Sequence, residues 1–359
     1  MLSSVVYKHL AQSPENEVDL ARSYCLAVAR SYWKSFRLKT GVSWTIRRYS
    51  GLVIGLPPDL RKEAYGDALR LSQMAPDDAG YQLAIQYLKL LPTTYRSQNG
   101  VYYTPIKIAE RMIADAADRG VDFQTARAID PASGGSAFLG PLCRVMRKEG
   151  LSDQALVDDL CSRLTGFEID PFAAWLSQFV VDCELAMIAP TALKPPLIVH
   201  QCDALQVSNR FFGTYDYVIG NPPYGRIPAD DVPVERYGDI VSGAPNLYQL
   251  FYKLAFLLAN DHGVVHLLTP TGFLGGQYFR ALRAYLEAHA SAVSFDFFVR
   301  RTKVFDEVQQ ELVISLFDKS QSTKSTDVRS IDVAPDGALS LTPIGTVHLT
   351  WSRNLLHLS

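Results

Sequence analysis

The sequence predicts an α/β fold with a mostly parallel sheet and a helical region ahead of it. Residues 1–95 carry apolar side chains at helical spacing, whereas short apolar runs alternate with helical patterns from residue 100 onward. Such alternation is typical of parallel strands whose connecting helices cover both faces of the sheet. With 48% hydrophobic and 20% charged residues, the 359-residue chain can build two or three packed domains, which excludes a disordered protein.

Three segments predict the helices of the N-terminal region. Residues 18–36 place apolar side chains at helical spacing, and Gly41 follows as a stop. Prolines open a second helix over 59–74, and a third helix spans 80–91. The basic and aromatic segment 32–49 fits a solvated helix face followed by a loop, with a contact to DNA as the alternative.

Seven short apolar runs are the predicted strands of the sheet. A helix capped by Thr104, with Pro105 at its first position, precedes them. About a dozen residues without a helical pattern join the last two runs, which predicts an antiparallel hairpin at the sheet edge. The runs are Ala126–Ile129, Leu164–Ile169, Leu197–Gln201, Tyr215–Ile219, Gly263–Leu268, Val293–Val299 and Leu312–Phe317.

The chain is expected to divide into three regions. Residues 1–97 form the helical region, and residues 98–318 form the α/β domain. Residues 319–327 are polar and predict a linker, after which two short strands flank an Asp-Gly turn. Residues 319–359 are therefore expected to hold a linker and the start of an incomplete further region.

Composition limits the compartment and the partners. The net charge is −2, from 35 Lys and Arg against 37 Asp and Glu, whereas proteins that hold nucleic acid unaided are usually more basic. No apolar run approaches the ~20 residues that span a bilayer, and the N-terminus lacks a signal-peptide pattern. None of the five cysteines forms a CxxC pair. We expect a cytoplasmic protein with no membrane partner and no metal site.

Small and acidic residues follow the first three predicted strands, where parallel sheets bind ligands. Small residues let the backbone approach a ligand, and a carboxylate suits ribose hydroxyls or an exocyclic amine. Taken singly, these features also fit a tight turn, a surface carboxylate and a helix cap. The residues are Asp130, Pro131, Ala132, Ser133, Gly134 and Gly135 after the first strand, Glu168 and Ile169 after the second, and Asp203 and Ala204 after the third.

The fourth strand runs into the tetrapeptide Asn221, Pro222, Pro223 and Tyr224. Two prolines fix the backbone and remove two donors, so the nearby carbonyls are left to accept from another group. The Asn221 side chain adds an acceptor, and Tyr224 adds an aromatic face. Two converging acceptors suit an amino group and a stacked ring suits a planar base, although a rigid loop with a structural tyrosine is the alternative.

The order of these motifs resembles the gamma-class N6-adenine DNA methyltransferases, which use S-adenosylmethionine. The resemblance covers about residues 98–318 and implies a Rossmann-like, seven-stranded methyltransferase domain there. Where that family has Cys-Gly-Ser-Gly, this chain has Ser133-Gly134-Gly135-Ser136, which adds a side chain at a crowded position. The matching motifs are Gly100–Pro105, Asp130-Pro131, Glu168, Asp203-Ala204, Asn221–Tyr224, Asn246-Leu247-Tyr248 and Val304-Phe305.

The resemblance implies two groups of site residues. The first group binds the cofactor, with Asn221 at its border. The cofactor's methionine moiety is held by Tyr102, Thr104, Pro105, Asp130, Pro131, Ala132, Ser133, Gly134 and Gly135, its ribose by Glu168, and its adenine by Ile169, Asp203 and Ala204. In the second, the target amine is held by Asn221 and Pro222 within the catalytic tetrapeptide that includes Pro223, while Tyr224 and Phe305 stack on the flipped base.

Other activities remain as alternatives. The acceptor is expected to be adenine in duplex DNA, in a restriction–modification or phage-defence setting. Cytosine N4, RNA and protein glutamine are the other acceptors, and a non-catalytic subunit that binds S-adenosylmethionine or DNA is the alternative from another class. Sequence specificity is expected from a separate target-recognition subunit or from an absent C-terminal domain.

Overall fold

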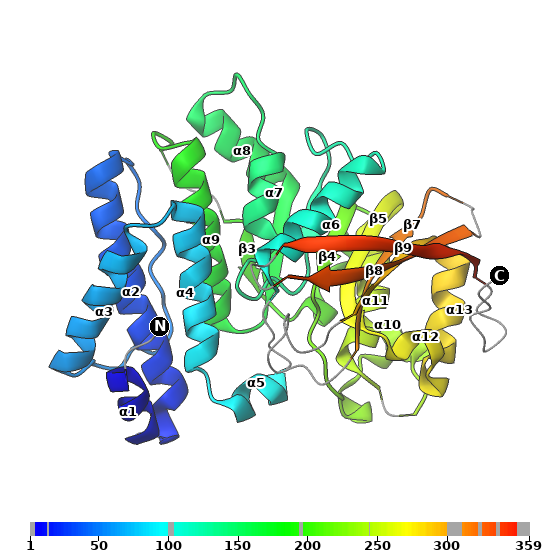
Figure 1. Ribbon diagram of the computed structural model, residues 1–359, viewed down its shortest axis with the longest axis horizontal. Helices are drawn as coiled ribbons and strands as arrows, with labels where there is room; N and C mark the ends of the chain where they lie inside the picture. The colour runs from blue at the N-terminus through cyan, green and yellow to red at the C-terminus, as the bar shows by residue number, and fades with distance from the viewer. Residues whose placement is uncertain are drawn as a thin grey trace. The chain divides into compact units, whose positions relative to one another are not determined.

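The computed structural model describes residues 4–12, 14–99, 104–193, 197–243, 245–299, 311–321, 325–334 and 338–349. The chain forms two compact units that interleave along the sequence, and Figure 1 labels their elements. The first unit comprises Met1–Tyr103, Ser133–Leu164 and Glu168–Gln201, and the second comprises Thr104–Ala132, Thr165–Phe167 and Cys202–Ser359. The predicted mixed α/β class with N-terminal helices is confirmed.

The first unit is mainly helical. Its predicted helices over 18–36, 59–74 and 80–91 are confirmed as α2, α3 and α4. Gly41 ends α2 as predicted, because its left-handed φ of 73° lets its N–H donate to the Arg37 carbonyl at 2.9 Å. The elements are α1 (Ser4–Gln12), α2 (Glu17–Thr40), α3 (Pro58–Leu71), α4 (Pro76–Leu90), α5 (Thr93–Asn99), α7 (Leu139–Val145), α8 (Asp153–Arg163), α9 (Pro171–Ile188) and β3 (Val199–Gln201).

The aromatic residues of the segment 32–49 lie in the core, so both the expected solvated helix face and the alternative of a DNA contact are wrong for these side chains. The rings of Trp33 and Trp44 are 5.1 Å apart, and Trp33 also meets Phe179 of α9 edge-on at 6.1 Å. Tyr49 packs against Phe172 at 5.1 Å. These aromatic side chains are 6% exposed or less, because the apolar faces of α2 and α9 are covered by each other's rings.

Helix α9 is long and apolar enough to cross a membrane by length and composition alone. In the structure 78% of that stretch is buried inside the protein. An apolar helix buried on most sides is typical of the core of a globular domain.

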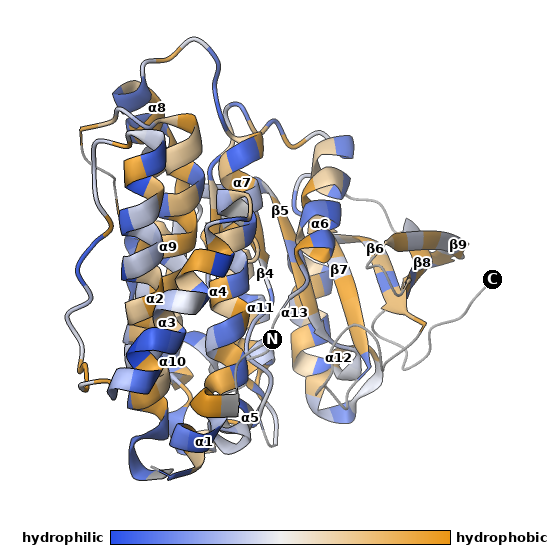
Figure 2. Ribbon diagram, turned by 60° about the vertical axis from the view of Figure 1, so that its left-hand side comes forward, coloured by the Kyte–Doolittle hydropathy of each residue, from blue (hydrophilic) through white to orange (hydrophobic). Residues whose placement is uncertain are grey.

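The second unit carries most of the sheet. Six predicted strands outside the first unit are confirmed in type and position, and Figure 2 colours most of β5 and β7 as hydrophobic. The elements are α6 (Ile106–Asp118), β1 (Ala128–Asp130), β2 (Leu164–Glu168), β4 (Tyr215–Gly220), α10 (Val234–Tyr237), α11 (Leu247–Leu258), β5 (Ala259–Pro270), α12 (Gly272–Gly275), α13 (Arg280–His289), β6 (Ser291–Phe298), β7 (Leu312–Asp318), β8 (Ser325–Val333) and β9 (Leu339–His348).

The strands of the second unit follow the order β2-β1-β4-β5-β7-β6-β8-β9. β1, β4 and β5 pair in parallel, and β7 pairs antiparallel with both β5 and β6. The predicted antiparallel pairing of the last two strands is thus confirmed, but the pair does not lie at the edge. β8 pairs in parallel with β6 and antiparallel with β9, so two further strands extend the sheet.

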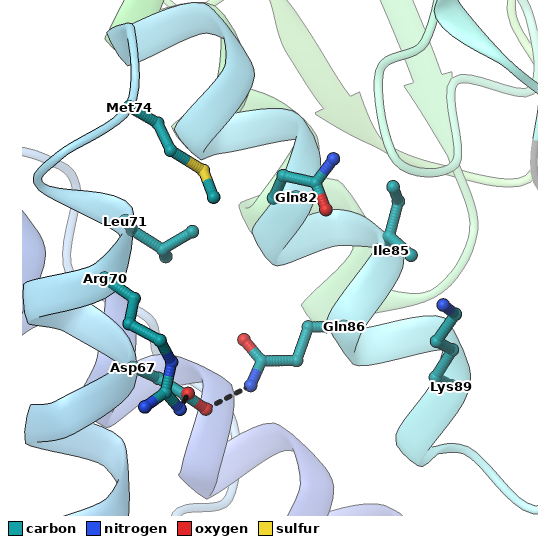
Figure 3. Close-up of a pocket in the computed structure, with 8 residues that line it drawn as sticks. All are labelled: Asp67, Arg70, Leu71, Met74, Gln82, Ile85, Gln86 and Lys89. Atoms are coloured by element: carbon teal, nitrogen blue, oxygen red, sulfur yellow. Dashed lines mark hydrogen bonds and ion pairs between the residues drawn. The ribbon is translucent and has the colours of Figure 1, made fainter. Parts of the chain in front are cut away.

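A small cavity of about 150 Å³ lies between α3 and α4 in the first unit (Figure 3). The buried carboxylate of Asp67 beside it accepts hydrogen bonds from Tyr24 and Gln86 and forms an ion pair with Arg70. None of the predicted site residues lines it. The lining residues are Asp67, Arg70, Leu71, Met74, Gln82, Ile85, Gln86 and Lys89.

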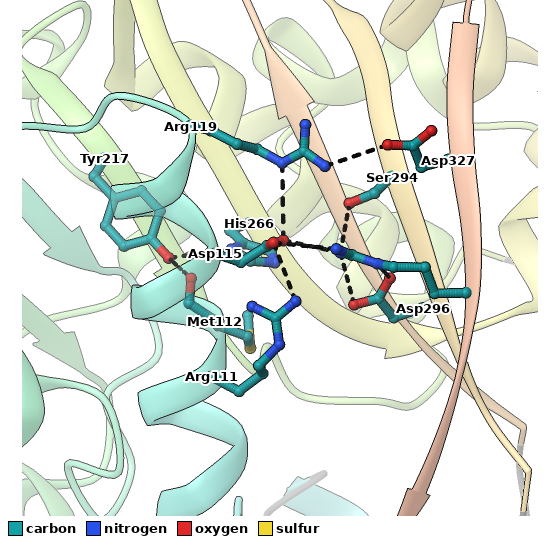
Figure 4. Close-up of polar contacts among 10 residues, drawn as sticks. Arg111, Met112, Asp115, Arg119, Tyr217, His266, Ser294, Asp296 and Asp327 are labelled. Carbon is teal, nitrogen blue, oxygen red and sulfur yellow. Dashed lines mark hydrogen bonds and ion pairs between the residues drawn. The ribbon is translucent and has the colours of Figure 1, made fainter. Parts of the chain in front are cut away.

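A network of ion pairs joins α6 to the sheet (Figure 4). The carboxylate of Asp115 on α6 accepts hydrogen bonds of 3.1 and 2.9 Å from Arg329 on β8, and one of 3.1 Å from Arg111. Arg329 also donates to Asp296 on β6 at 2.5 and 2.9 Å. Burial would raise the pKa of Asp115, but the bonds and charges of the arginines lower it to about 2. The network therefore holds α6 against β6 and β8.

Removing the shared arginine should destabilise the fold. We expect Arg329→Met to lower the free energy of unfolding by about 3–5 kcal/mol, because the buried carboxylate of Asp296 loses its counter-ion and that of Asp115 keeps only the weaker contacts with Arg111 and Arg119. Denaturant titration followed by circular dichroism measures the change. Lys107→Met on the same helix is the control, because Lys107 and Glu110 form an exposed pair that should contribute less than about 1 kcal/mol. Equal losses in the two variants would contradict this role for the network.

Candidate active site

The tetrapeptide after β4 forms a hydrogen-bonded unit with the residue that precedes α6. The Asn221 side-chain N–H donates to Thr104 Oγ1 at 2.9 Å, across 117 residues of sequence. The Tyr224 hydroxyl donates to Asn221 Oδ1. Pro222 and Tyr224 are buried, while Asn221 stays half-buried. The Asn221 amide is therefore held from both ends in one orientation.

Thr104 has a different partner from the one predicted. Pro105 occupies the position that caps α6, and the cap makes no side-chain hydrogen bond. Thr104 is 4% exposed and uses its hydroxyl to accept from Asn221. The Thr-Pro segment and the tetrapeptide thus meet in the second unit, as motifs that share one site would.

Asp130 lies against the start of the tetrapeptide. This carboxylate is fully buried at the end of β1, and its Oδ1 accepts from the Ala132 N–H at 3.0 Å. A Cβ placed on Gly220 would stand 3.0 Å from the same oxygen. A larger residue there would crowd the carboxylate and require it to shift by a few tenths of an ångström, so glycine is favoured before Asn221.

Asp203 caps a short turn. Its Oδ1 accepts from the Leu205 N–H at 3.0 Å, and its Oδ2 accepts from the Gln206 side chain at 2.6 Å. Arg236 donates to the carbonyls of Leu205 and Val207 at 2.9 and 3.0 Å. Tyr237 donates to the Leu205 carbonyl at 3.1 Å. These two anchors could not be predicted from the sequence, because no local pattern links Arg236 and Tyr237 to a turn about 31 residues earlier.

The glycine-rich turn of the first unit is fastened to α9 by two serines. Ser136 Oγ donates to the Ser177 carbonyl at 3.0 Å, and Ser177 Oγ donates to the Gly134 carbonyl. Ser136 has a left-handed φ of 59°, which favours glycine. A Cβ on Gly135 would stand 2.9 Å from the Ala84 side chain on α4, so a larger residue does not fit there.

Glu168 joins the turn to the end of β2. Its Oε2 accepts from the Gly134 N–H and its Oε1 from the Asp170 N–H, both at 2.9 Å. Burial raises the pKa of Glu168, and these backbone bonds partly oppose the shift. Ile169 beside it is 66% exposed, which is unusual for an isoleucine and leaves an apolar surface next to a carboxylate.

Two predicted site residues, Tyr102 and Phe305, lie outside the described part of the chain. The remaining predicted residues are described. Among the residues that the structure places, no group of three or more His, Cys, Asp or Glu side chains is arranged to hold a metal ion.

Comparison with protein families gives one match. The profile of the Eco57I restriction-modification methylases matches residues 163–305, which is less than half of the chain. Over this segment the chain is similar to that family. No curated protein sequence matches the chain.

Solved structures share the fold at low sequence identity. The DrdV–DNA complex has a TM-score of 0.57 at 15% identity, covering 77% of this chain and 32% of that chain. The modification subunit assigned to a type I restriction enzyme of Vibrio vulnificus has a TM-score of 0.53 at 17% identity, covering 78% and 56%. A class I S-adenosylmethionine-dependent methyltransferase assigned in Listeria monocytogenes has a TM-score of 0.56 at 12% identity, covering 88% and 92%.

These similarities show that the chain has the fold of S-adenosylmethionine-dependent methyltransferases. The chain spans less than two thirds of the length of the DrdV and Vibrio proteins.

The strained serine gives a test of the turn. Ser136→Ala should lower the free energy of unfolding by about 1 kcal/mol, because the bond to the Ser177 carbonyl is lost. Ser136→Gly loses the same bond but relieves about 1 kcal/mol of left-handed strain, so it should be more stable than the alanine variant. Thermal unfolding of the three proteins gives the order. A glycine variant less stable than the alanine variant would contradict the strained conformation.

Proposed function

We propose that this chain transfers the methyl group of S-adenosylmethionine to N6 of a flipped-out adenine in duplex DNA. The observation that carries the proposal is the arrangement of Thr104, Asn221 and Tyr224 at the end of β4. The similarity of residues 163–305 to restriction-modification methylases, and the DNA bound to DrdV, support a role in a restriction–modification or phage-defence system.

The held amide of Asn221 suits an amino group as its partner. An amide oxygen has two lone pairs, of which the Tyr224 hydroxyl uses one, so the other can accept from a target amine. The bond to Thr104 fixes the N–H side and keeps the oxygen from turning away. The Pro222 main-chain carbonyl supplies a second acceptor.

These two acceptors activate the amine. The lone pair of adenine N6 is conjugated with the ring, and hydrogen bonds from both N–H groups to Asn221 and Pro222 draw the hydrogens out of the ring plane. The nitrogen held this way would accept the methyl group that bound S-adenosylmethionine would supply, and its extra proton would leave to water. Placement and electrostatic fit supply most of the rate enhancement.

The target base must leave the duplex to reach these groups. Flipping costs a few kcal/mol, and stacking on aromatic side chains offsets about 1–3 kcal/mol per contact. We assign the stacking role to Tyr224 and Phe305. Pro223 keeps the backbone between the acceptors and Tyr224 rigid.

The cofactor supplies an electrophilic methyl group when bound, and the residues present fit it. Glu168 would accept from the ribose hydroxyls, the exposed Ile169 would pack on the adenine, and Asp203 with the Ala204 N–H would hold the adenine edge. The small side chains from Pro131 to Gly135 leave room for the methionine moiety. Asp130, Tyr102, Thr104 and Pro105 would border it.

The partners follow from the same proposal. Duplex DNA is the substrate, the cytoplasm is the compartment, and sequence specificity comes from a separate specificity subunit or region. The modification subunit from Vibrio vulnificus, which shares the fold, supports that division of labour.

Product analysis tests the acceptor. The chain is incubated with methyl-labelled S-adenosylmethionine and, in separate reactions, unmethylated genomic DNA, RNA or glutamine-containing peptides, and the products are hydrolysed for mass spectrometry. We expect label in N6-methyladenine from the DNA reaction. Label in N4-methylcytosine, RNA or peptide would contradict the assigned acceptor.

Two variants test the amide arrangement. Asn221→Ala should lower kcat at least about 100-fold while cofactor affinity is unchanged, because a group aimed at the reacting nitrogen is lost. Thr104→Val removes the orienting bond and should lower kcat about 10-fold, equivalent to about 1.4 kcal/mol. Thr125→Val, an exposed threonine that bonds Asp122, is the control and should keep full activity. A fully active Asn221→Ala protein would remove this residue from the mechanism.

A further inference from the structure

An ion pair links the N-terminal helices to the turn that carries Glu168. Asp170 lies two residues after Glu168, and its N–H donates to Glu168 Oε1 at 2.9 Å. Asp170 Oδ1 caps α9 by accepting from the N–H groups of Phe172 and Ala173, at 2.9 and 2.7 Å. Asp170 thus caps α9 with its carboxylate and binds Glu168 with its backbone N–H.

The second oxygen of Asp170 is held by the helical region. Arg22 on α2 forms an ion pair with Asp170 Oδ2, and Tyr95 on α5 donates to the same oxygen at 2.9 Å. Arg22 also donates to the hydroxyls of Tyr87 and Tyr95, each at 3.4 Å. The side chains of Arg22 and Asp170 are only 17% and 18% exposed, so the pair is far less screened than a surface pair.

The donors around Asp170 keep their protons at neutral pH. Burial first, and the charge of Asp170 after it, raise the pKa of Tyr95 to about 12. Arginine stays charged at any physiological pH. The carboxylate therefore faces two permanent donors from α2 and α5, while its other oxygen serves α9.

We propose that Arg22 is a positioning residue for the cofactor: it fixes Asp170 and, through it, the turn that presents Glu168 and Ile169. This inference rests on the proposed function, because it takes Glu168 to be the ribose ligand. Loss of Arg22 leaves the Oδ1 cap of α9 in place but frees the turn to rotate. The helices of residues 1–99 then serve cofactor binding through Arg22 and Tyr95.

Calorimetric titration with S-adenosylmethionine tests this positioning role. Arg22→Met should weaken cofactor affinity about tenfold and raise KM for the cofactor with little change in kcat, because Asn221 is untouched. Arg22→Lys should recover part of the affinity, because it restores the charge. Tyr95→Phe should lose about threefold. Combined with Glu168→Gln, the Arg22→Met loss should largely disappear, because Arg22 acts on cofactor binding through the position of Glu168.

Arg144→Met is the matched control. Arg144 pairs with Glu184 between α7 and α9 in the same unit, away from the Glu168 turn, so its loss should leave cofactor affinity unchanged. Unchanged cofactor affinity in a folded Arg22→Met protein would overturn the inference. If Arg22→Met fails to fold, unchanged affinity in both Arg22→Lys and Tyr95→Phe would overturn it instead. Equal weakening by Arg144→Met would also overturn it. A wild-type chain that binds no S-adenosylmethionine would contradict the proposed function itself.

Discussion

The hydrogen bond between Asn221 and Thr104 is the contact on which the candidate chemistry depends. An asparagine at the end of a strand can present either its oxygen or its nitrogen to a ligand, and this bond selects the oxygen. Its partner stands at the start of α6, so the position of that helix matters as much as the tetrapeptide. The ion pairs of Asp115 and Arg329 hold the other half of the same helix against β6 and β8. Strands β6 and β8 therefore help to hold α6, and with it Thr104 at the start of that helix.

In the first unit, hydrogen bonds from side chains hold the glycine-rich turn in place. This turn is held by serine hydroxyls and by the carboxylate of Glu168, with little apolar packing of its own. Asp170 extends this polar frame to Arg22 and Tyr95. Hydrogen bonds suit a turn that must stay open to a ligand, because they fix backbone groups without filling the space above them. The left-handed Ser136 shows that this frame is maintained at a cost in backbone strain.

Much of the fold and of the candidate site could be predicted from the sequence, and the features that could not be predicted share a physical cause. Strand ends and the tetrapeptide are local patterns, so the sequence alone is enough to propose Asp130, Glu168 and Asn221 as site residues. Partners of charged side chains are set by tertiary packing, and Arg22, Arg236 and Arg329 carry no local signal for theirs. The segment 32–49 failed for the same reason. Its residues predict a solvated helix face, with a nucleic-acid surface as the alternative, and only the packing of α9 shows that the rings are covered.

Sequencing of modified bases in the source organism is the sharpest test of the proposal that Asn221 directs methyl transfer to adenine N6 in DNA. Genomic DNA is compared with and without the gene, and after return of the wild-type or the Asn221→Ala gene. We expect N6-methyladenine at a recurring DNA site. This methylation should disappear when the gene is deleted and return only with the wild-type gene. Unchanged N6-methyladenine after deletion, or its return with Asn221→Ala, would contradict the account.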